Sequence, residues 1–275
     1  MAEADAKFLP KLVESEAALH PGMRLSQHDS PQALVDYLLR RCRLPSADGR
    51  EQGIVNMGPD GIHFAAFDLA MRAGQPSIIL VESSSMNTEG GAKLALRLGE
   101  TMAQRSPQGW NWPNRHLMIF ETRTQQSSID CGMFSLVTCK TMFRERAVFE
   151  SLHTRLRAGE FEKALTFHHF PFAKSDELLP PSIMRHTQSS GRLNQYALHH
   201  APTNESTAAA MSEVLDYQQA LTFARDDRRY SVSIECERME MARRALPHPL
   251  EGLDDTFLRG LEDEASRLPH VKRLP

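Results

Sequence analysis

The sequence predicts an α+β fold in which a β-sheet packs against a helix that begins at Cys131. Three observations lead to this prediction. Short segments rich in β-branched and other apolar residues follow one another between residues 52 and 121. Segments with a helical repeat lie before and after them. With 275 residues, 41% of them hydrophobic, the chain can build one sizeable core.

Four segments are expected to be strands. Residues 61–70 alternate in a way that places Phe64 and Ala66 on one face of a strand and His63 on the other. Residues 76–82 form a continuous apolar run, which is typical of a central strand. The other two expected strands cover residues 52–57 and 116–121.

The remaining elements are expected to be mostly helical. Residues 1–50 predict helices, and Ser30 and Pro31 are suited to begin the second of them. The segment 133–156 has no Gly or Pro and predicts one long helix, entered at Cys131, whose beginning is buried. Further helices are expected at 92–105, 210–225 and 236–246, and a further strand at 228–235.

Composition excludes several classes of protein. The net charge of -3 argues against a chain that wraps nucleic acid or binds membranes through a polybasic surface. No apolar run approaches the roughly 18 residues of a transmembrane helix, and the N-terminus lacks the pattern of a signal peptide. The four cysteines form no CxxC pair and no zinc-like cluster with histidine. We therefore expect free thiols in a reducing compartment and no metal site.

Cys131, His63 and Glu82 are candidates for a catalytic triad. The N–H groups and dipole at the start of a helix favour a thiolate at Cys131, and Gly132 is expected to allow a tight turn that keeps the sulfur accessible. His63 and Glu82 lie on successive expected strands, which can bring an imidazole to a carboxylate. Gln125 lies close before the cysteine and can donate to an oxyanion. The residues alone leave open that Cys131 is a structural core thiol.

Three blocks of the sequence carry these residues in a specific order: IVNMG-PDG-IHFAAFD with His63 and Asp68, LVESSS with Glu82, and QQSSIDCGMFSL with Cys131. Together they resemble the YopJ/HopZ/AvrRxv family of type III secreted effector acetyltransferases. Similarity in KTMFRER, LPPSIMRHTQSSGRLNQY and YSVSIECERMEMA extends the resemblance to roughly residues 50–245. It implies a mixed β-sheet on a central helix, as in clan CE cysteine proteases, together with a helical regulatory region.

The resemblance implies transfer of an acetyl group from acetyl-CoA. Cys131 would hold the acetyl group as a thioester, His63 would be the general base, Glu82 would orient His63, and Gln125 would help to form the oxyanion hole. The acceptors would be Ser, Thr or Lys of host proteins, typically kinases or immune regulators, reached by type III secretion into the host cell. Because a long secretion-signal tail is not evident, we expect the signal in the first few residues or another route of delivery.

The family is also activated by inositol hexakisphosphate, which requires a cluster of Arg, Lys and His donors. The resemblance points first to Arg185 and His186 and then to Arg238. The further candidate ligands are Arg192, Arg228, Arg229, Arg144 and Arg146.

Arg185 is a departure from the family pattern, which usually has an autoacetylated Lys at this position. A guanidinium is not an acyl acceptor under these conditions, so we predict no autoacetylation at Arg185. Lys140 and Lys174 are the alternative acceptors.

Four regions are expected along the chain: an N-terminal helical regulatory segment, a catalytic core, a regulatory region that binds inositol phosphate, and a loosely held tail. Their ranges are 1–50, 51–165, 166–246 and 247–275. Trp110 and Trp112 are interpreted as half-buried core residues rather than partner-binding anchors.

Two other functions are alternatives to the acetyltransferase. One is a cysteine protease or deconjugase for ubiquitin-like modifiers, which would use the same triad with water as the acceptor. The other is a binding protein without catalytic activity. The arginine-rich blocks favour the acetyltransferase, since such a protease needs no polyphosphate activator, and the complete triad argues against the binding protein.

Overall fold

The computed structural model describes residues 2–42, 48–56, 63–85, 96, 98, 100, 104, 116–127, 129–161, 167–200, 204–225 and 228–245. Within these residues a six-stranded sheet runs in the order β1-β2-β3-β4-β5-β6. Its strands are β1 (Leu25–His28), β2 (Gly49–Asn56), β3 (Phe64–Arg72), β4 (Gln75–Glu82), β5 (Leu117–Glu121) and β6 (His168–Phe170). The sheet is mixed, because β2, β3 and β4 pair antiparallel and the remaining neighbours pair parallel.

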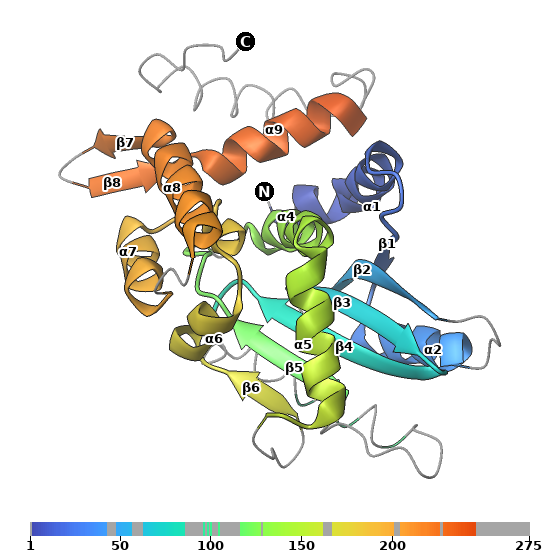
Figure 1. Cartoon of the computed structure of the whole chain (residues 1–275). Coiled ribbons are helices and arrows are strands. Elements are labelled where there is room, and N and C mark those ends of the chain that lie inside the picture. The colour runs from blue at the N-terminus through green and yellow to red at the C-terminus, as the bar shows by residue number, and fades with distance from the viewer. Residues whose placement is uncertain are drawn as a thin grey trace.

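Helices cover both faces of this sheet and continue into a C-terminal group (Figure 1). The helices are α1 (Ala2–Leu19), α2 (Pro31–Cys42), α4 (Cys131–Arg144), α5 (Arg146–Ala158), α6 (Phe172–Leu178), the 3₁₀ helix η1 (Pro181–Met184), α7 (Ser190–His199), α8 (Glu205–Ala220) and α9 (Ser233–Ala245). The hairpin β7 (Thr222–Arg225) and β8 (Arg228–Ser231) joins α8 to α9. In Figure 1, α8, α9 and this hairpin lie together above the sheet, and α9 packs on α1 and α4.

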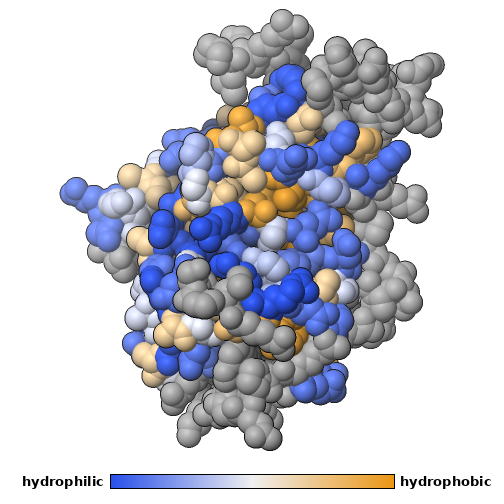
Figure 2. Space-filling view, turned by 90° about the vertical axis from the view of Figure 1, so that its right-hand side faces the viewer, coloured by the Kyte–Doolittle hydropathy of each residue, from blue (hydrophilic) through white to orange (hydrophobic). Residues whose placement is uncertain are grey.

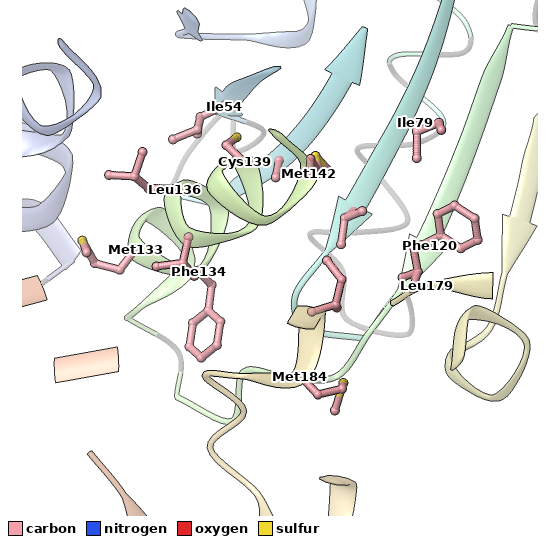
Figure 3. Packing of buried hydrophobic residues seen from close by; sticks show 14 of the residues in the cluster. Ile54, Ile79, Phe120, Met133, Phe134, Leu136, Cys139, Met142, Leu179 and Met184 are labelled. Carbon is pink, nitrogen blue, oxygen red and sulfur yellow. The ribbon is translucent and has the colours of Figure 1, made fainter. Parts of the chain in front are cut away.

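The predicted alternation of the strands divides the core into two layers. Phe64 and Ala66 of β3 belong to the cluster under α4, α5 and α1, whereas Ala65 and Phe67 belong to the cluster under α2. Figure 3 shows the first cluster, where Cys139 and Met142 of α4 lie on the side of the helix toward the strands. These observations confirm the α+β class and place the N-terminus of α4 against the ends of β3 and β4.

Several local expectations were wrong. The helix expected at 210–225 ends at Ala220 and is followed by β7, and the strand expected at 228–235 ends at Ser231, since α9 begins at Ser233. The segment 1–50 is not wholly helical, since β1 lies within it and pairs parallel with β2. The long helix expected at 133–156 is interrupted at Glu145, where the backbone has φ −86° and ψ 36°. No Pro or Gly marks this break in the sequence, and only the packing of two separate helices on the sheet reveals it. Ser30 does cap α2, because its Oγ accepts from the Ala33 N–H at 3.1 Å.

Asp68, which the family pattern places after His63, ties α5 to the sheet instead of joining the triad. Its Oδ1 accepts a hydrogen bond from Arg50 Nε at 2.7 Å and lies 2.9 Å from His153 Nε2. His153 Nδ1 in turn meets Ser77 Oγ at 2.8 Å. Burial would raise the pKa of Asp68, but hydrogen bonds and positive charge from His153 and Arg50 lower it. Because Asp68, His153 and Ser77 are each 0% exposed, this Ser–His–Asp set is structural.

Gly53 of β2 permits a close approach between neighbouring elements. A Cβ atom at this position would lie 2.2 Å from Cζ of Phe67. The carbonyl of Gly53 accepts from the Cys139 thiol at 3.2 Å, which brings α4 close to β2. A residue without a side chain is therefore required here.

Several predictions lie outside the described residues. They are the positions of Trp110 and Trp112, most of the expected helix at 92–105, and the tail at 247–275. Among the helices that the structure describes, none is long and apolar enough to cross a bilayer. On the side of the molecule that carries α1, β1 and α2, the surface is mostly hydrophilic, with hydrophobic surface gathered mainly in the upper half of the view (Figure 2).

Candidate active site

His63 and Glu82 meet at the end of the β3–β4 pair. Ala66 pairs with Val81, so the continued register places Glu82 opposite Ala65 and diagonal to His63. His63 Nε2 and Glu82 Oε2 are 2.8 Å apart. The strand register thus produces the imidazole–carboxylate contact expected from the sequence.

The Glu82 carboxylate is held on both oxygens. Oε1 accepts from the backbone N–H of Ser84 at 2.9 Å and from its hydroxyl at 2.8 Å, which leaves Oε2 for His63. Glu82 is 0% exposed, so water does not compete for these positions. A buried carboxylate with a fixed plane is suited to hold an imidazole in one orientation.

Cys131 is the first residue of α4 and forms a side-chain hydrogen bond with His63. Since Nε2 of His63 faces Glu82, Nδ1 is the ring nitrogen left for the thiol. Burial would lower the pKa of His63, but hydrogen bonds and negative charge from Cys131 and Glu82 raise it to about 10. The structure therefore favours an imidazolium at neutral pH, placed between a sulfur and a carboxylate.

Exposure at the site is uneven. Cys131 is 2% exposed, whereas the side chain of His63 is 21% exposed. The expected role of Gly132 in a tight turn was wrong, because it lies inside α4 and a Cβ there would make only ordinary contacts, the nearest 3.5 Å from Phe64. Accessibility of the sulfur thus does not depend on Gly132.

Gln125 lies on the loop between β5 and α4. Its N–H donates to the Ser83 carbonyl at 2.9 Å, and its Oε1 accepts from the Ser83 hydroxyl at 2.7 Å. Nε2 donates to the Ser127 carbonyl at 2.6 Å. An amide nitrogen carries two N–H bonds, so this contact leaves a second donor on Gln125.

Asp130 is a site residue that sequence reasoning did not single out. Its carboxylate contacts Arg238 of α9 and the Ser127 hydroxyl, and it accepts from Gln188 Nε2 at 2.9 Å. Burial would raise its pKa, but these hydrogen bonds and the charge of Arg238 lower it. The available signal was its position directly before the nucleophile, although the sequence could not show that Gln188 and Arg238, from two separate segments, converge on it.

The segment around Arg185 and His186 packs between α8 and α9. Arg185 lies over the ring of Tyr217, with 4.0 Å between Cζ and the ring centroid, and donates to Glu213 at 2.8 Å. His186 is 9% exposed, and its ring meets Tyr217 edge-on and the backbone of Ser233. Burial lowers the pKa of His186 to about 4. Of the two, Arg185 is the one with a partly exposed side chain, at 33%.

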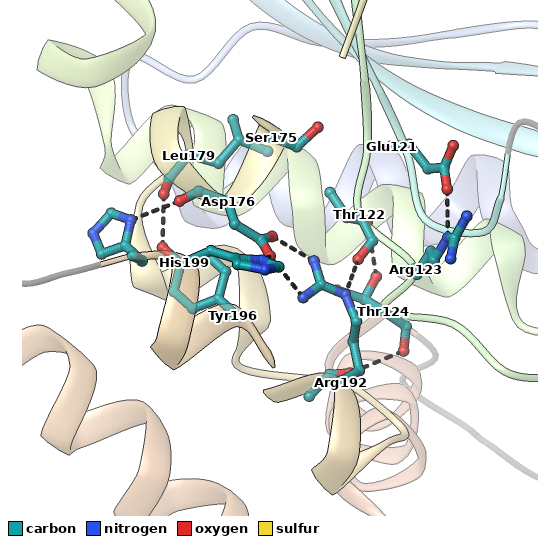
Figure 4. A network of polar contacts seen from close by, with 12 residues as sticks. Glu121, Thr122, Arg123, Thr124, Ser175, Asp176, Leu179, Arg192, Tyr196 and His199 are labelled. Carbon is teal, nitrogen blue, oxygen red and sulfur yellow. Dashed lines mark hydrogen bonds and ion pairs between the residues drawn. The ribbon is translucent and has the colours of Figure 1, made fainter. Parts of the chain in front are cut away.

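Arg192 forms an internal ion pair where the sequence predicted a phosphate ligand. Its guanidinium contacts both oxygens of Asp176, and its Nε donates to the Thr122 carbonyl at 2.7 Å (Figure 4). The side chain is 4% exposed. We correct the prediction, because these contacts commit Arg192 to joining α6, α7 and the end of β5.

Arg144 and Arg146 lie exposed at the junction of α4 and α5. The length of α4 puts Arg144 about 20 Å from Cys131 along the helix axis, at 1.5 Å per residue, and Arg146 follows it at the start of α5. Arg228 and Arg229 belong to β8, but their side chains lie outside what the structure describes. The structure thus brings Arg185, His186 and Arg238 toward one region and leaves Arg144 and Arg146 far from the nucleophile.

Comparison with known proteins identifies the family. A profile described as YopJ serine/threonine acetyltransferase matches residues 1–244. The chain belongs to this family. The YopJ serine/threonine-protein acetyltransferase of Yersinia pestis is 31% identical over 192 residues, which are 70% of this chain and 64% of the relative. YopJ of Yersinia pseudotuberculosis matches with the same identity and coverage, so the chain spans just under two thirds of these relatives.

Solved structures show the YopJ-family fold in this chain. A structure of AvrA delL154 with IP6 and CoA superposes with a TM-score of 0.75 at 24% identity over 89% of both chains. HopZ1a in complex with IP6 superposes with a TM-score of 0.71 at 20% identity, over 90% of this chain and 85% of HopZ1a. These likenesses confirm the fold that the resemblance implied.

The two alternative acceptors for autoacetylation differ in this YopJ-family chain. Lys140 is 6% exposed, and its amine pairs with Glu16 at 2.9 Å and Glu237 at 2.6 Å. The side chain of Lys174 is 54% exposed, and its amine lies 2.5 Å from Glu177. The structure therefore argues against Lys140, because a buried, doubly paired ammonium is not available as a nucleophile, and retains Lys174.

Proposed function

We propose that this chain transfers an acetyl group from acetyl-CoA through a Cys131 thioester to Ser, Thr or Lys side chains of host proteins. The observation that carries the proposal is the contact of His63 with Glu82 at 2.8 Å, with Cys131 as the second partner of the ring. Membership of the YopJ serine/threonine acetyltransferase family supports this chemistry over others.

In the first half-reaction the Cys131 sulfur attacks the acetyl carbonyl and forms a new C–S bond. His63, which holds the thiol proton as an imidazolium, delivers that proton to the departing CoA sulfur as the original thioester bond breaks. Glu82 stabilises the imidazolium and fixes its plane. The second N–H of the Gln125 side chain would donate a hydrogen bond to the oxyanion that forms on the acetyl carbonyl.

In the second half-reaction a hydroxyl or amine of the acceptor attacks the Cys131 thioester. Neutral His63 accepts the acceptor's proton, and the Cys131 thiolate leaves, which restores the original thiolate–imidazolium pair. A thioester suits this sequence because it stores the acyl group while remaining reactive toward a positioned nucleophile.

Labelling tests the proposal. The protein is incubated with radiolabelled acetyl-CoA, with and without inositol hexakisphosphate, beside Cys131→Ala. We expect label on the wild type and on an acceptor protein, and none with Cys131→Ala. Absence of label in every condition, together with cleavage of a ubiquitin-like probe, would instead support a protease.

We also propose that inositol hexakisphosphate activates the chain and that Arg185 and His186 help to bind it. Structures of AvrA and HopZ1a hold IP6, and Arg185 has a partly exposed guanidinium whose partner, Glu213, a phosphate can replace. Arg185→Ala/His186→Ala should lose the thermal stabilisation given by this ligand. Arg72→Ala, which removes an exposed arginine paired with Glu150, is the matched control and should keep it.

By the same family relationship, we propose host kinases or immune regulators as targets and type III secretion as the route into the host cell. Pull-down of acetylated host proteins with wild-type chain, compared with Cys131→Ala, tests the target class.

A further inference from the structure

Gln188 reaches from the regulatory segment into the loop that precedes the nucleophile. Its Oε1 accepts from two consecutive backbone N–H groups, those of Gln126 at 2.7 Å and Ser127 at 2.9 Å. Its Nε2 donates to Asp130 Oδ2 at 2.9 Å. Its own N–H donates to the Thr124 carbonyl at 2.9 Å. One side chain and one peptide group therefore hold both ends of the loop.

Asp130 connects this clamp to the nucleophile and to α9. It directly precedes Cys131, and its carboxylate contacts Arg238 as well as Gln188 and Ser127. Asp130 is 3% exposed and Gln188 is only partly exposed, so solvent competes little with these contacts. Two separate parts of the regulatory region thus act on the residue next to the reacting sulfur.

We propose that Gln188 is a positioning residue for acyl transfer, which holds the loop of Gln125 and Asp130 in the shape that presents oxyanion donors beside Cys131. This inference rests on the proposed acyl chemistry. In this role Gln188 acts through its contacts with the loop and needs no contact with substrate. Through it, a change in the regulatory segment alters the rate of thioester formation.

The chemistry of the clamp requires an amide. One end must accept from two N–H groups, and the other must donate to a carboxylate. A glutamate at 188 keeps the shape and the accepting end but places a second negative charge against Asp130. The double variant Asp130→Asn/Gln188→Glu exchanges the amide and the carboxylate. The amide nitrogen at position 130 can then donate to the carboxylate at position 188, and the net charge is unchanged.

The test uses the full chain and the burst of p-nitrophenol released when p-nitrophenyl acetate acylates Cys131. We expect Gln188→Glu and Asp130→Asn each to slow the burst about 10- to 100-fold, since a small displacement of a catalytic group or an oxyanion donor has effects of this size. The double exchange should recover most of the rate. Gln219→Ala, an exposed glutamine on α8, is the matched control and should not change it.

Two further readouts separate positioning from folding. Alkylation of Cys131 by iodoacetamide needs no oxyanion donor, so Gln188→Glu should keep its alkylation rate and its melting temperature. A burst equal to wild type in Gln188→Glu would overturn the proposal. So would a parallel loss of burst, alkylation and melting temperature that the double exchange does not restore, or the absence of any burst in the wild type. A wild-type burst without label from acetyl-CoA would refute the proposed acetyl donor and leave the role of Gln188 standing.

Discussion

Replacing Glu82 with glutamine removes one negative charge from the site and leaves its shape. The carbonyl oxygen of the new amide can still accept from Ser84, but the amide nitrogen then faces His63 Nε2, donor against donor. The rise in the pKa of His63 from 6.5 to about 10 corresponds to about 5 kcal/mol. Cys131 and Glu82 both contribute to that rise against the cost of burial. Assigning somewhat under half to Glu82 gives about 2 kcal/mol, or about a 30-fold effect.

The assay is single-turnover formation of the acyl-enzyme, followed by rapid quench and mass spectrometry of the peptide that carries Cys131. We expect Glu82→Gln to be about 30-fold slower than wild type at neutral pH. Because losing about 2 kcal/mol lowers the pKa of His63 only part of the way back from about 10, the rate of this variant should decline at a lower pH than that of wild type, which keeps its imidazolium to about pH 10. A Glu82→Gln rate within twofold of wild type, with the same pH profile, would refute the reasoning.

Three further predictions concern stability, each measured by urea unfolding of the variant beside the wild type. Asp68→Ala leaves the buried Arg50 guanidinium without its carboxylate and should cost about 3 kcal/mol; a loss under about 1 kcal/mol would contradict this. Gly53→Ala places a Cβ 2.2 Å from Phe67 Cζ and should cost about 1–3 kcal/mol, and an unchanged midpoint would show that the close approach is not required. His186 stays neutral when folded, with a pKa of about 4, while the unfolded chain protonates near 6.5. Stability should therefore fall by about 3 kcal/mol as the pH drops from 6.5 to 4, and His186→Gln should lose this part of the dependence. Parallel pH curves for the two proteins would contradict the assignment.

Strands β2 to β5 and the His63–Glu82 contact were predictable because they depend on local patterns. Strand alternation fixes which residues share a face, and consecutive antiparallel strands bring the end of one beside the start of the other. Helix initiation at Cys131 also follows from local sequence. These features are set by residues close together in the chain, so a single sequence contains the information.

The contacts made across long sequence separations were not predictable. In the sequence nothing distinguishes Arg192 from a surface arginine, but in the structure it is buried and paired with Asp176. Lys140 is not available as an acetyl acceptor because carboxylates of α1 and α9 pair with its amine. In the same way, Gln188 and Asp130 are 58 residues apart and meet only in the folded chain. The sequence shows which groups are charged or polar, whereas tertiary packing decides which of them are already paired.

The most direct measurement is the mass of the peptide that carries Cys131 after brief incubation with acetyl-CoA and quenching. We expect one acetyl group on Cys131, which hydroxylamine removes as it removes a thioester and which moves to an acceptor protein when one is added. Acetylation of the acceptor by Cys131→Ala, or acetyl groups that never appear on Cys131 while the acceptor is modified, would contradict a covalent path through this sulfur.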